Sequence, residues 1–149
     1  MPEQETTKQK ETMNFIEDVR KNVFTRVGVS EIHGVGVIAI RDIPKGINPM
    51  RTPKPEKFGV VKARAMQAAL ISLPYEIQKL IVAMCPMRPD DDEWDVPANG
   101  LNSINVAWYL NHSDKPNMRE RGGDFFTKRK IKKGEELTVD YGTYGALNL

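Results

Sequence analysis

Residues 108–117, Trp-Tyr-Leu-Asn-His-Ser-Asp-Lys-Pro-Asn, are the stretch from which the rest of this chain is best interpreted. The stretch begins apolar and aromatic and then changes abruptly to Asn111, His112 and Ser113, with a Pro-Asn turn after them. Such a change predicts that a buried segment ends here by presenting polar side chains.

Two other stretches have the same character. Residues 134–142, Gly-Glu-Glu-Leu-Thr-Val-Asp-Tyr-Gly, predict a short apolar strand that ends in an acid and a tyrosine. Residues 33–37, His-Gly-Val-Gly-Val, place two glycines where another strand begins. Two glycines separated by one residue allow positive φ and a close approach of a ligand to the backbone. A plain hairpin turn or bulge fits the same residues.

In this order the three stretches resemble the SET-domain protein-lysine methyltransferases, whose motifs read roughly GxG, NHS-x-x-PN and GEEL-T-x-DY. The resemblance covers about residues 23–144, and the two late motifs are far more specific than the glycines. It implies a mostly β domain with a small helical insert (α+β), a SET-type β-clip fold with a C-terminal pseudoknot. We expect a tail or short helix over 1–22 and the SET domain over 23–149, with a variable helical insert over about 48–100.

The resemblance also implies a function: methyl transfer from S-adenosylmethionine to lysine side chains of a protein or peptide substrate, histones included. Tyr141 is then the catalytic tyrosine, with its hydroxyl directed at the reacting centre. The residues implied to bind the cofactor are His33, Gly34, Val35, Gly36, Asn111, His112 and Tyr141. Those implied to line the substrate channel are Tyr109, Val139 and Tyr144.

The chemistry sets its own demands on such a site. The nucleophile must be a neutral amine, and with a reference pKa near 10.4 only about one lysine in 2,500 is neutral at pH 7. The site must therefore lower the lysine pKa through a dry channel and a neighbouring cation, which the cofactor's sulfonium provides. Val139 stands where relatives often carry Phe or Tyr facing the channel. The resemblance thus implies a roomier channel, with a product not confined to monomethyl-lysine.

Three departures from the family pattern stand out. Asp114 replaces the cysteine often found after Asn-His-Ser, and no cysteine-rich post-SET segment follows Tyr141. The tyrosine-bearing motif after the early glycines is also missing, with residues 57–59, Lys-Phe-Gly, as a faint counterpart. We therefore expect a partner subunit, the N-terminal segment or the substrate to complete the wall of the site, and a homodimer is one form this could take.

Composition limits the remaining possibilities. At 149 residues and 40% hydrophobic, the chain suits one compact domain. Cys85 is the only cysteine, so neither an intrachain disulfide nor a zinc-thiolate cluster can form. The net charge of +2 gives no reason to expect direct nucleic-acid binding, and the charged segment from Glu3 to Glu11 has no apolar run suited to a signal peptide or membrane span. An intracellular location is expected, with nucleus and cytoplasm both open.

The region between the motifs predicts helices over 61–73 and after Pro74. In the second helix, Ile77, Leu80, Ile81 and Met84 have the spacing of a face that packs against a core. The acidic residues of 90–95 predict a solvated loop or, alternatively, an acidic lip that attracts a basic peptide. Residues 41–46 and 129–134 share the pattern Arg-x-Ile-x-Lys-Gly, which we interpret as one turn used twice.

Two rival functions remain open at this point. His33 and His112 with Asp114 or Asp140 could form a two-histidine, one-carboxylate iron site, which metal analysis would detect. Alternatively, the chain could be a SET-like module that binds a peptide without transferring methyl groups. Incubation with labelled S-adenosylmethionine and basic proteins distinguishes that module from an enzyme.

Overall fold

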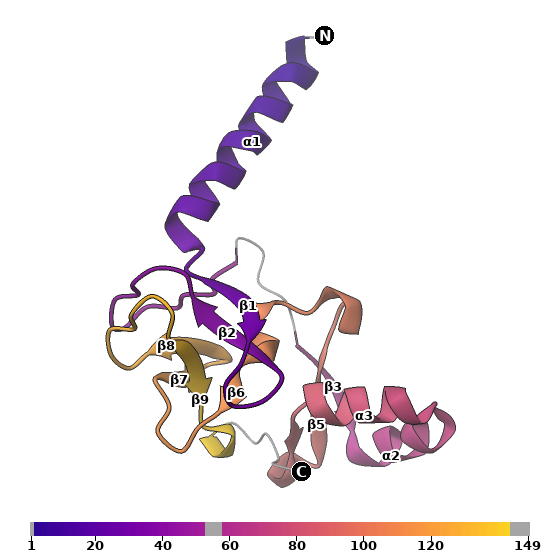
Figure 1. The fold of residues 1–149 in the computed structure, drawn as a ribbon. Helices are drawn as coiled ribbons and strands as arrows, with labels where there is room; N and C mark the ends of the chain where they lie inside the picture. Colours follow the sequence, from indigo (N-terminus) through magenta and orange to yellow (C-terminus); the bar gives the residue numbers. More distant parts are fainter. Residues whose placement is uncertain (1, 53–57, 144–149) are drawn as a thin grey trace.

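The computed structural model describes residues 2–52 and 58–143 (Figure 1). The described helices are α1 (Pro2–Asn22), α2 (Ala63–Ser72) and α3 (Tyr75–Met84). The described strands are β1 (Thr25–Val29), β2 (Val35–Ala39), β3 (Phe58–Lys62), β4 (Met87–Arg88), β5 (Glu93–Pro97), β6 (Asn111–His112), β7 (Met118–Arg121), β8 (Asp124–Thr127) and β9 (Glu136–Val139). Short strands with few helices confirm the mostly β fold class with a small helical part.

The main sheet has the strand order β1-β2-β9-β6. β1 and β2 form an antiparallel hairpin with Thr25 opposite Ala39, and β9 pairs with the other edge of β2. One face of this sheet carries the main core, since the apolar residues of β2 and β9 alternate inward. The buried members of the core are Val37, Ala39, Ile43, Leu110, Met118, Ile131, Leu137 and Val139.

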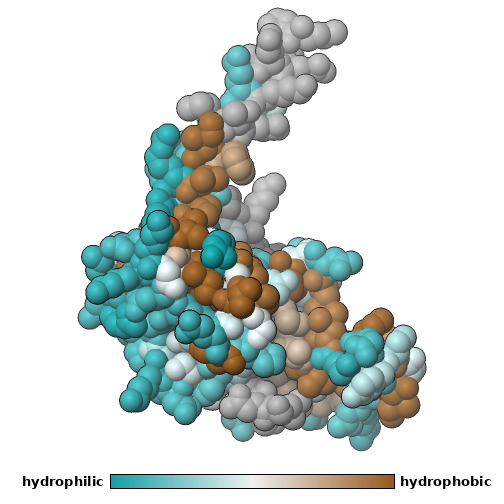
Figure 2. All heavy atoms as spheres, viewed as in Figure 1, coloured by the Kyte–Doolittle hydropathy of each residue, from teal (hydrophilic) through white to brown (hydrophobic). Residues whose placement is uncertain are grey.

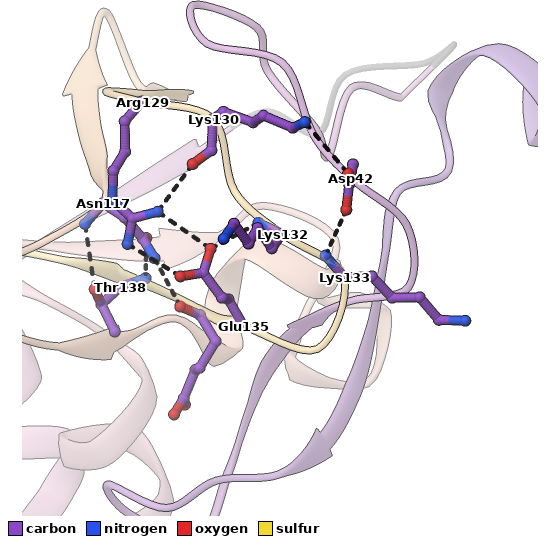
Figure 3. Close-up of polar contacts among 9 residues, drawn as sticks. Asp42, Asn117, Arg129, Lys130, Lys132, Lys133, Glu135 and Thr138 are labelled. Atoms are coloured by element: carbon purple, nitrogen blue, oxygen red, sulfur yellow. Dashed lines mark hydrogen bonds and ion pairs between the residues drawn. The ribbon is translucent and has the colours of Figure 1, made fainter.

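The Asn-His-Ser segment lies directly beside the last strand. β6 runs parallel to β9, with Asn111 opposite Thr138 and His112 opposite Val139. Further along, the buried Asn117 donates from Nδ2 to the Glu136 carbonyl at 2.8 Å and accepts at Oδ1 from the Thr138 N–H at 2.8 Å (Figure 3). The two late motifs are therefore fixed to each other over their whole length, as the predicted pseudoknot requires.

The two Arg-x-Ile-x-Lys-Gly turns also lie side by side. Ile43 and Ile131, both fully buried, form an isolated antiparallel bridge with N···O distances of 2.8 and 2.9 Å. Asp42 accepts a hydrogen bond from the Lys133 N–H at 2.9 Å and pairs with Lys130 Nζ at 3.4 Å (Figure 3). The repeated pattern thus gives two copies of one turn that pair with each other.

The insert contains a sheet that the sequence analysis missed, with the order β3-β5-β4. Val60 and Val61 belong to β3, opposite Asp95 and Trp94 of β5, so α2 begins only at Ala63. The acidic segment is therefore partly a strand and not simply a loop. A small second core of Ala63, Met66, Cys85 and Trp94 joins this sheet to the helices.

The structure corrects the prediction that one face of α3 packs against a core. Ile77 is 41% and Leu80 47% exposed, and no residue of α3 is buried, although Ile81 does pack against the second core. Helical spacing shows which side chains share a face, but only the tertiary structure decides whether another element covers it. Here a single small sheet covers too little of the helical pair.

Helix α1 occupies nearly all of the 1–22 segment that was expected to be a tail or short helix, and it projects away from the body as an arm (Figure 1). Arg41 of the body donates to the Arg20 carbonyl at 3.0 Å near the end of the helix. Phe15, Ile16 and Val19 are 69%, 40% and 41% exposed, and an apolar stripe is visible on the lower half of the arm (Figure 2). Of the helices in the described ranges, none is both long and apolar enough to cross a membrane.

Candidate functional site

An open pocket lies between the main sheet and the insert, and its wall is notably aromatic. Leu110 and Tyr141 line it from the main-sheet side, together with Phe125 from the β7–β8 hairpin. Phe58 from β3 and Trp108 complete the wall, their ring centroids 5.6 Å apart. These rings shield a long side chain that enters between them from part of the solvent, which favours its neutral form.

Tyr141 stands where β9 has just ended and a short 3-10 helix (Tyr141–Thr143) begins. Its hydroxyl donates a hydrogen bond to the Leu110 carbonyl at 2.5 Å. Burial raises the pKa of the phenol, and the negative charge of Glu136 raises the pKa further. The hydroxyl is therefore a protonated donor at neutral pH, with its oxygen still able to accept.

His112 connects Tyr141 to the Asn-His-Ser segment. Its Nδ1 accepts a hydrogen bond from the Tyr141 N–H at 3.1 Å, which places the ring proton on Nε2. Nε2 lies 3.0 Å from Asp114 Oδ1, so it donates a hydrogen bond to this aspartate, the residue that departs from the family pattern. The two contacts fix both the tautomer and the orientation of the ring.

Asn111 contacts the loop that carries the early glycines. Its Nδ2 lies 3.2 Å from the His33 carbonyl and 3.0 Å from the Val35 carbonyl. Gly34 adopts φ +51° and accepts a hydrogen bond at its carbonyl from the Ser30 N–H at 2.9 Å, which closes the turn. Gly36 lies beneath the loop, in β2.

The structure thus brings the predicted cofactor residues together: the 33–36 loop contacts Asn111, and His112 next to it contacts Tyr141. It places the predicted channel residues differently. Val139 is 1% exposed inside the main core, Tyr109 packs against that core, and neither lines the pocket. Tyr144 lies outside the described residues. The channel role of these three residues stays a prediction.

Sequence reasoning missed several residues of the pocket and its surroundings. The pocket includes Trp108 and Phe58, which lie within the stretches 108–117 and 57–59 but were not predicted to be site residues. Ser30 and Glu136, which also contact Asn111, gave no local signal, because they meet across 106 residues of chain.

The acidic segment is largely neutralised by its own neighbours. Arg88 contacts Asp95 at 2.6 Å and Asp91 at 3.3 Å, and Lys62 pairs with Glu93. Carboxylates nevertheless line both walls of the pocket, from the insert on one side and the β7–β8 hairpin on the other: Asp90, Asp91, Asp95, Glu120 and Asp124.

No group of three His, Cys, Asp or Glu side chains suited to a metal ion occurs within residues 2–52 and 58–143. The iron-site alternative therefore has no candidate ligand set in that part of the chain.

A mostly β domain whose Asn-His-Ser segment runs parallel to a strand ending in Asp-Tyr has the architecture of a SET domain. The family model described as "SET domain" matches residues 34–142. The chain therefore belongs to the SET domain family.

Known relatives agree with this assignment. The Drosophila melanogaster protein named histone-lysine N-methyltransferase trr is 33% identical over 130 residues, which are 82% of this chain but only 5% of that protein. Among solved structures, a humanized mutant of the Chaetomium thermophilum Polycomb Repressive Complex 2 bound to the inhibitor GSK126 is similar, with a TM-score of 0.56 and 19% identity over 85% of this chain and 16% of that chain. An autoinhibited form of the complex (ctPRC2) bound to S-adenosylmethionine gives a TM-score of 0.56 and 20% identity over 83% and 16%. At these identities the likeness supports the fold.

Proposed function

We propose that this chain is a protein-lysine N-methyltransferase that uses S-adenosylmethionine. The observation that carries the proposal is Tyr141, which ends the strand motif, lines an aromatic pocket and holds its hydroxyl against the Leu110 carbonyl. Its backbone N–H is bound to His112, next to Asn111, so the pocket and the polar loop are joined. The family and the name of the Drosophila relative support the same activity.

The polar loop suits the amino-acid end of the proposed cofactor. Four oxygens lie within 3.2 Å of Asn111 Nδ2, whose two N–H groups cannot satisfy all of them. A site with surplus acceptors favours an ammonium group, which brings three donors. Asn111 and the backbone of residues 33–36 would hold this end, with His112 beside them. The cofactor, when bound, supplies the methyl group on a sulfonium.

The residues of the pocket would act on the lysine. The aromatic wall of Phe58, Trp108 and Phe125 shields the amine from part of the solvent and so favours its neutral form. The Tyr141 oxygen and the Leu110 carbonyl, 2.5 Å apart, offer acceptors at the pocket wall that orient the amine and its transferring methyl. No side chain has to form a covalent intermediate.

The proposed substrate is a basic segment of a protein. Carboxylates on both pocket walls, Asp90 on the insert and Glu120 and Asp124 on the hairpin, favour a peptide with positive charges near the target lysine. Histone tails have this character, and the Drosophila relative is named a histone-lysine methyltransferase. We therefore propose histones as first candidates, and a location inside the cell.

The decisive experiment incubates the protein with S-adenosylmethionine and purified core histones and follows methyl-lysine by mass spectrometry. Methyl-lysine that depends on Tyr141 is the expected result. Tight binding of S-adenosylhomocysteine without transfer to histones or other basic proteins would favour the peptide-binding module instead. If S-adenosylhomocysteine does not bind, the proposal is wrong.

We also propose that α1 carries a contact with a second copy of the chain. A lone helix of 21 residues gains little stability in water without packing, and Phe15, Ile16 and Val19 leave an apolar stripe uncovered. A second α1 offers a stripe of the same kind, with Glu17, Arg20 and Lys21 beside it to complement one another across a two-fold axis.

A further inference from the structure

Glu136, the first residue of β9, is connected to both polar segments of the site. Its Oε1 accepts a hydrogen bond from Asn111 Nδ2 at 2.9 Å, and its Oε2 accepts one from Ser30 Oγ at 2.9 Å. Ser30 Oγ in turn accepts from the N–H groups of Ile32 at 2.9 Å and His33 at 3.1 Å. One carboxylate therefore connects the loop before β2 to the Asn-His-Ser segment.

The carboxylate also determines which way the Asn111 amide faces. Glu136 Oε1 and the carbonyl oxygens of His33 and Val35 can only accept hydrogen bonds, so they require the nitrogen of the amide on their side. Asn111 Oδ1 must then point away from this cluster, where it is available as an acceptor. If the amide were reversed, Asn111 Oδ1 would face the four oxygens that now surround Nδ2, and most of these contacts would lose their donor.

Gly36 gives an independent sign that this arrangement is built into the sequence. A Cβ atom at Gly36 would lie 1.9 Å from Glu136 Oε1 and 3.0 Å from Asn111 Nδ2. Gly36 has ordinary strand geometry, so no unusual φ explains the glycine. Gly34 differs, because it needs φ +51° and has no heavy atom near the place of a Cβ. The first glycine thus shapes the turn and the second leaves room for the carboxylate.

We propose that Glu136 is a positioning residue, which holds the Asn111 amide and the 30–36 loop in the geometry that receives the amino-acid end of the cofactor. The inference rests on the proposed function for the identity of that ligand. The negative charge of Glu136 also reaches Tyr141, since it adds to burial in raising the pKa of the phenol. Glu136 therefore lies close to both halves of the site without lining the pocket.

The test compares Glu136→Ala and Glu136→Gln with unmodified protein in two measurements. Calorimetry gives the affinity for S-adenosylhomocysteine, and amide hydrogen exchange by NMR gives the protection of Ile32 and His33, which needs no ligand. Glu136→Ala should weaken binding about tenfold or more and increase exchange by a similar factor. Glu136→Gln should give an intermediate effect in both, because its amide oxygen can accept from Asn111 while its NH₂ cannot replace the acceptor of the Ser30 hydroxyl.

Glu135→Gln is the matched control, because it removes a charge from the adjacent residue, whose contacts are with Arg129 and Lys132. It should leave the affinity unchanged and, because amides of an exposed loop exchange by local opening, it should also leave the exchange of Ile32 and His33 unchanged. If Glu136→Ala does not fold, Ser30→Ala tests the same network from the loop side and should shift both readouts in the same direction.

Each outcome decides a different claim. Unchanged exchange and affinity in Glu136→Ala would overturn the positioning role. A Glu136→Gln variant as weak as Glu136→Ala would also overturn it, because the contact with Asn111 that glutamine keeps would then contribute nothing. If unmodified protein failed to bind S-adenosylhomocysteine while its loop protection still depended on Glu136, the proposed function would be wrong and the positioning of Asn111 would stand.

Discussion

At the scale of single residues, the candidate site depends on a few side chains whose polar atoms are fixed by partners that can act only as donor or only as acceptor. His112 is restricted to one tautomer by a backbone N–H on one side and Asp114 on the other. The Tyr141 hydroxyl is directed at the Leu110 carbonyl. Because these groups are already oriented, little reorganisation is needed when ligands bind.

Tyr141→Phe should therefore remove most turnover while leaving the affinity for S-adenosylhomocysteine within a few-fold. The variant deletes the hydroxyl that contacts Leu110 but keeps the ring beside His112, so packing should survive. Initial rates with a histone peptide, together with calorimetric titration, measure both quantities. Near-normal turnover in a folded variant would show that Tyr141 is not catalytic.

Cys85 provides a residue-scale test of the second core. It is 5% exposed, and burial raises the pKa of its thiol to about 11, so very little thiolate is present at pH 8. We expect alkylation by iodoacetamide at pH 8 to be about a hundredfold slower in the folded protein than in urea, as followed by intact mass. A folded protein that reacts as fast as the unfolded one would mean that the insert opens readily.

At the scale of elements, the two paired turns connect the end of β2 to the start of β9. Glu135 accepts hydrogen bonds from Arg129 at 3.1 and 3.3 Å and from the Lys132 N–H at 2.6 Å (Figure 3). Asp42 contacts the same turn through Lys133 and Lys130. These contacts join the segment before β9 to the turn after β2.

The contribution of Glu135 should depend on pH. The Arg129 side chain, followed by the Lys132 N–H, lowers the pKa of this carboxyl below its ordinary value of 4.5. A depressed folded-state pKa contributes stability above the unfolded pKa, and that contribution disappears as pH falls through the folded value. Glu135→Gln should cost about 1 kcal/mol at pH 7, since the group is partly exposed, and clearly less near pH 3. Urea unfolding at both pH values measures this, and an equal loss at both would contradict the assignment.

The local features were predicted well from the sequence, but which surfaces other elements cover in the tertiary structure was not. The motif strands, the helices on either side of Pro74 and the meeting of Asn111, His112 and Tyr141 follow from motifs that are short and contiguous. The exposure of Ile77 and Leu80 could not be predicted, because spacing does not reveal what lies opposite a helix. The Ser30–Glu136 contact was equally hidden, because the two residues are 106 positions apart in the sequence.

The burial of Val139 changes which experiment best tests the methylation state of the product. Its position before Asp140 predicts a place in the lysine channel, whereas the structure buries it in the main core at 1% exposure. A tyrosine at this position would overpack the core and cost stability. The product state is therefore better read from the unmodified enzyme, where methyl-lysine beyond the mono form remains the expectation.

At the scale of the whole molecule, large apolar side chains are exposed on the α1 arm, on the insert and on the β1–β2 hairpin, where Val29 is 86% and Ile32 52% exposed. Those of the arm are Phe15, Ile16 and Val19, and on the insert Ile71 and Tyr75 are 85% and 69% exposed (Figures 1 and 2). Within residues 2–52 and 58–143, the arm is the longest helix, and its stripe can meet an identical copy around a two-fold axis.

The exposed stripe on the α1 arm predicts that the chain forms a dimer. Light scattering coupled to size exclusion should show a dimer of this 16.9 kDa chain at micromolar concentration. The double change Phe15→Glu and Val19→Glu should convert the dimer to monomer, because two charges would be buried on each side of the contact. The matched control, Ile71→Glu, places a charge on the exposed insert helix and should leave the dimer intact.

Monomer from unmodified protein would refute the contact, and a dimer lost only in the Ile71→Glu variant would move the contact to the insert. Loss of the dimer with histone methylation retained would further show that each copy forms its site alone, since none of the pocket or loop residues comes from the exposed stripe.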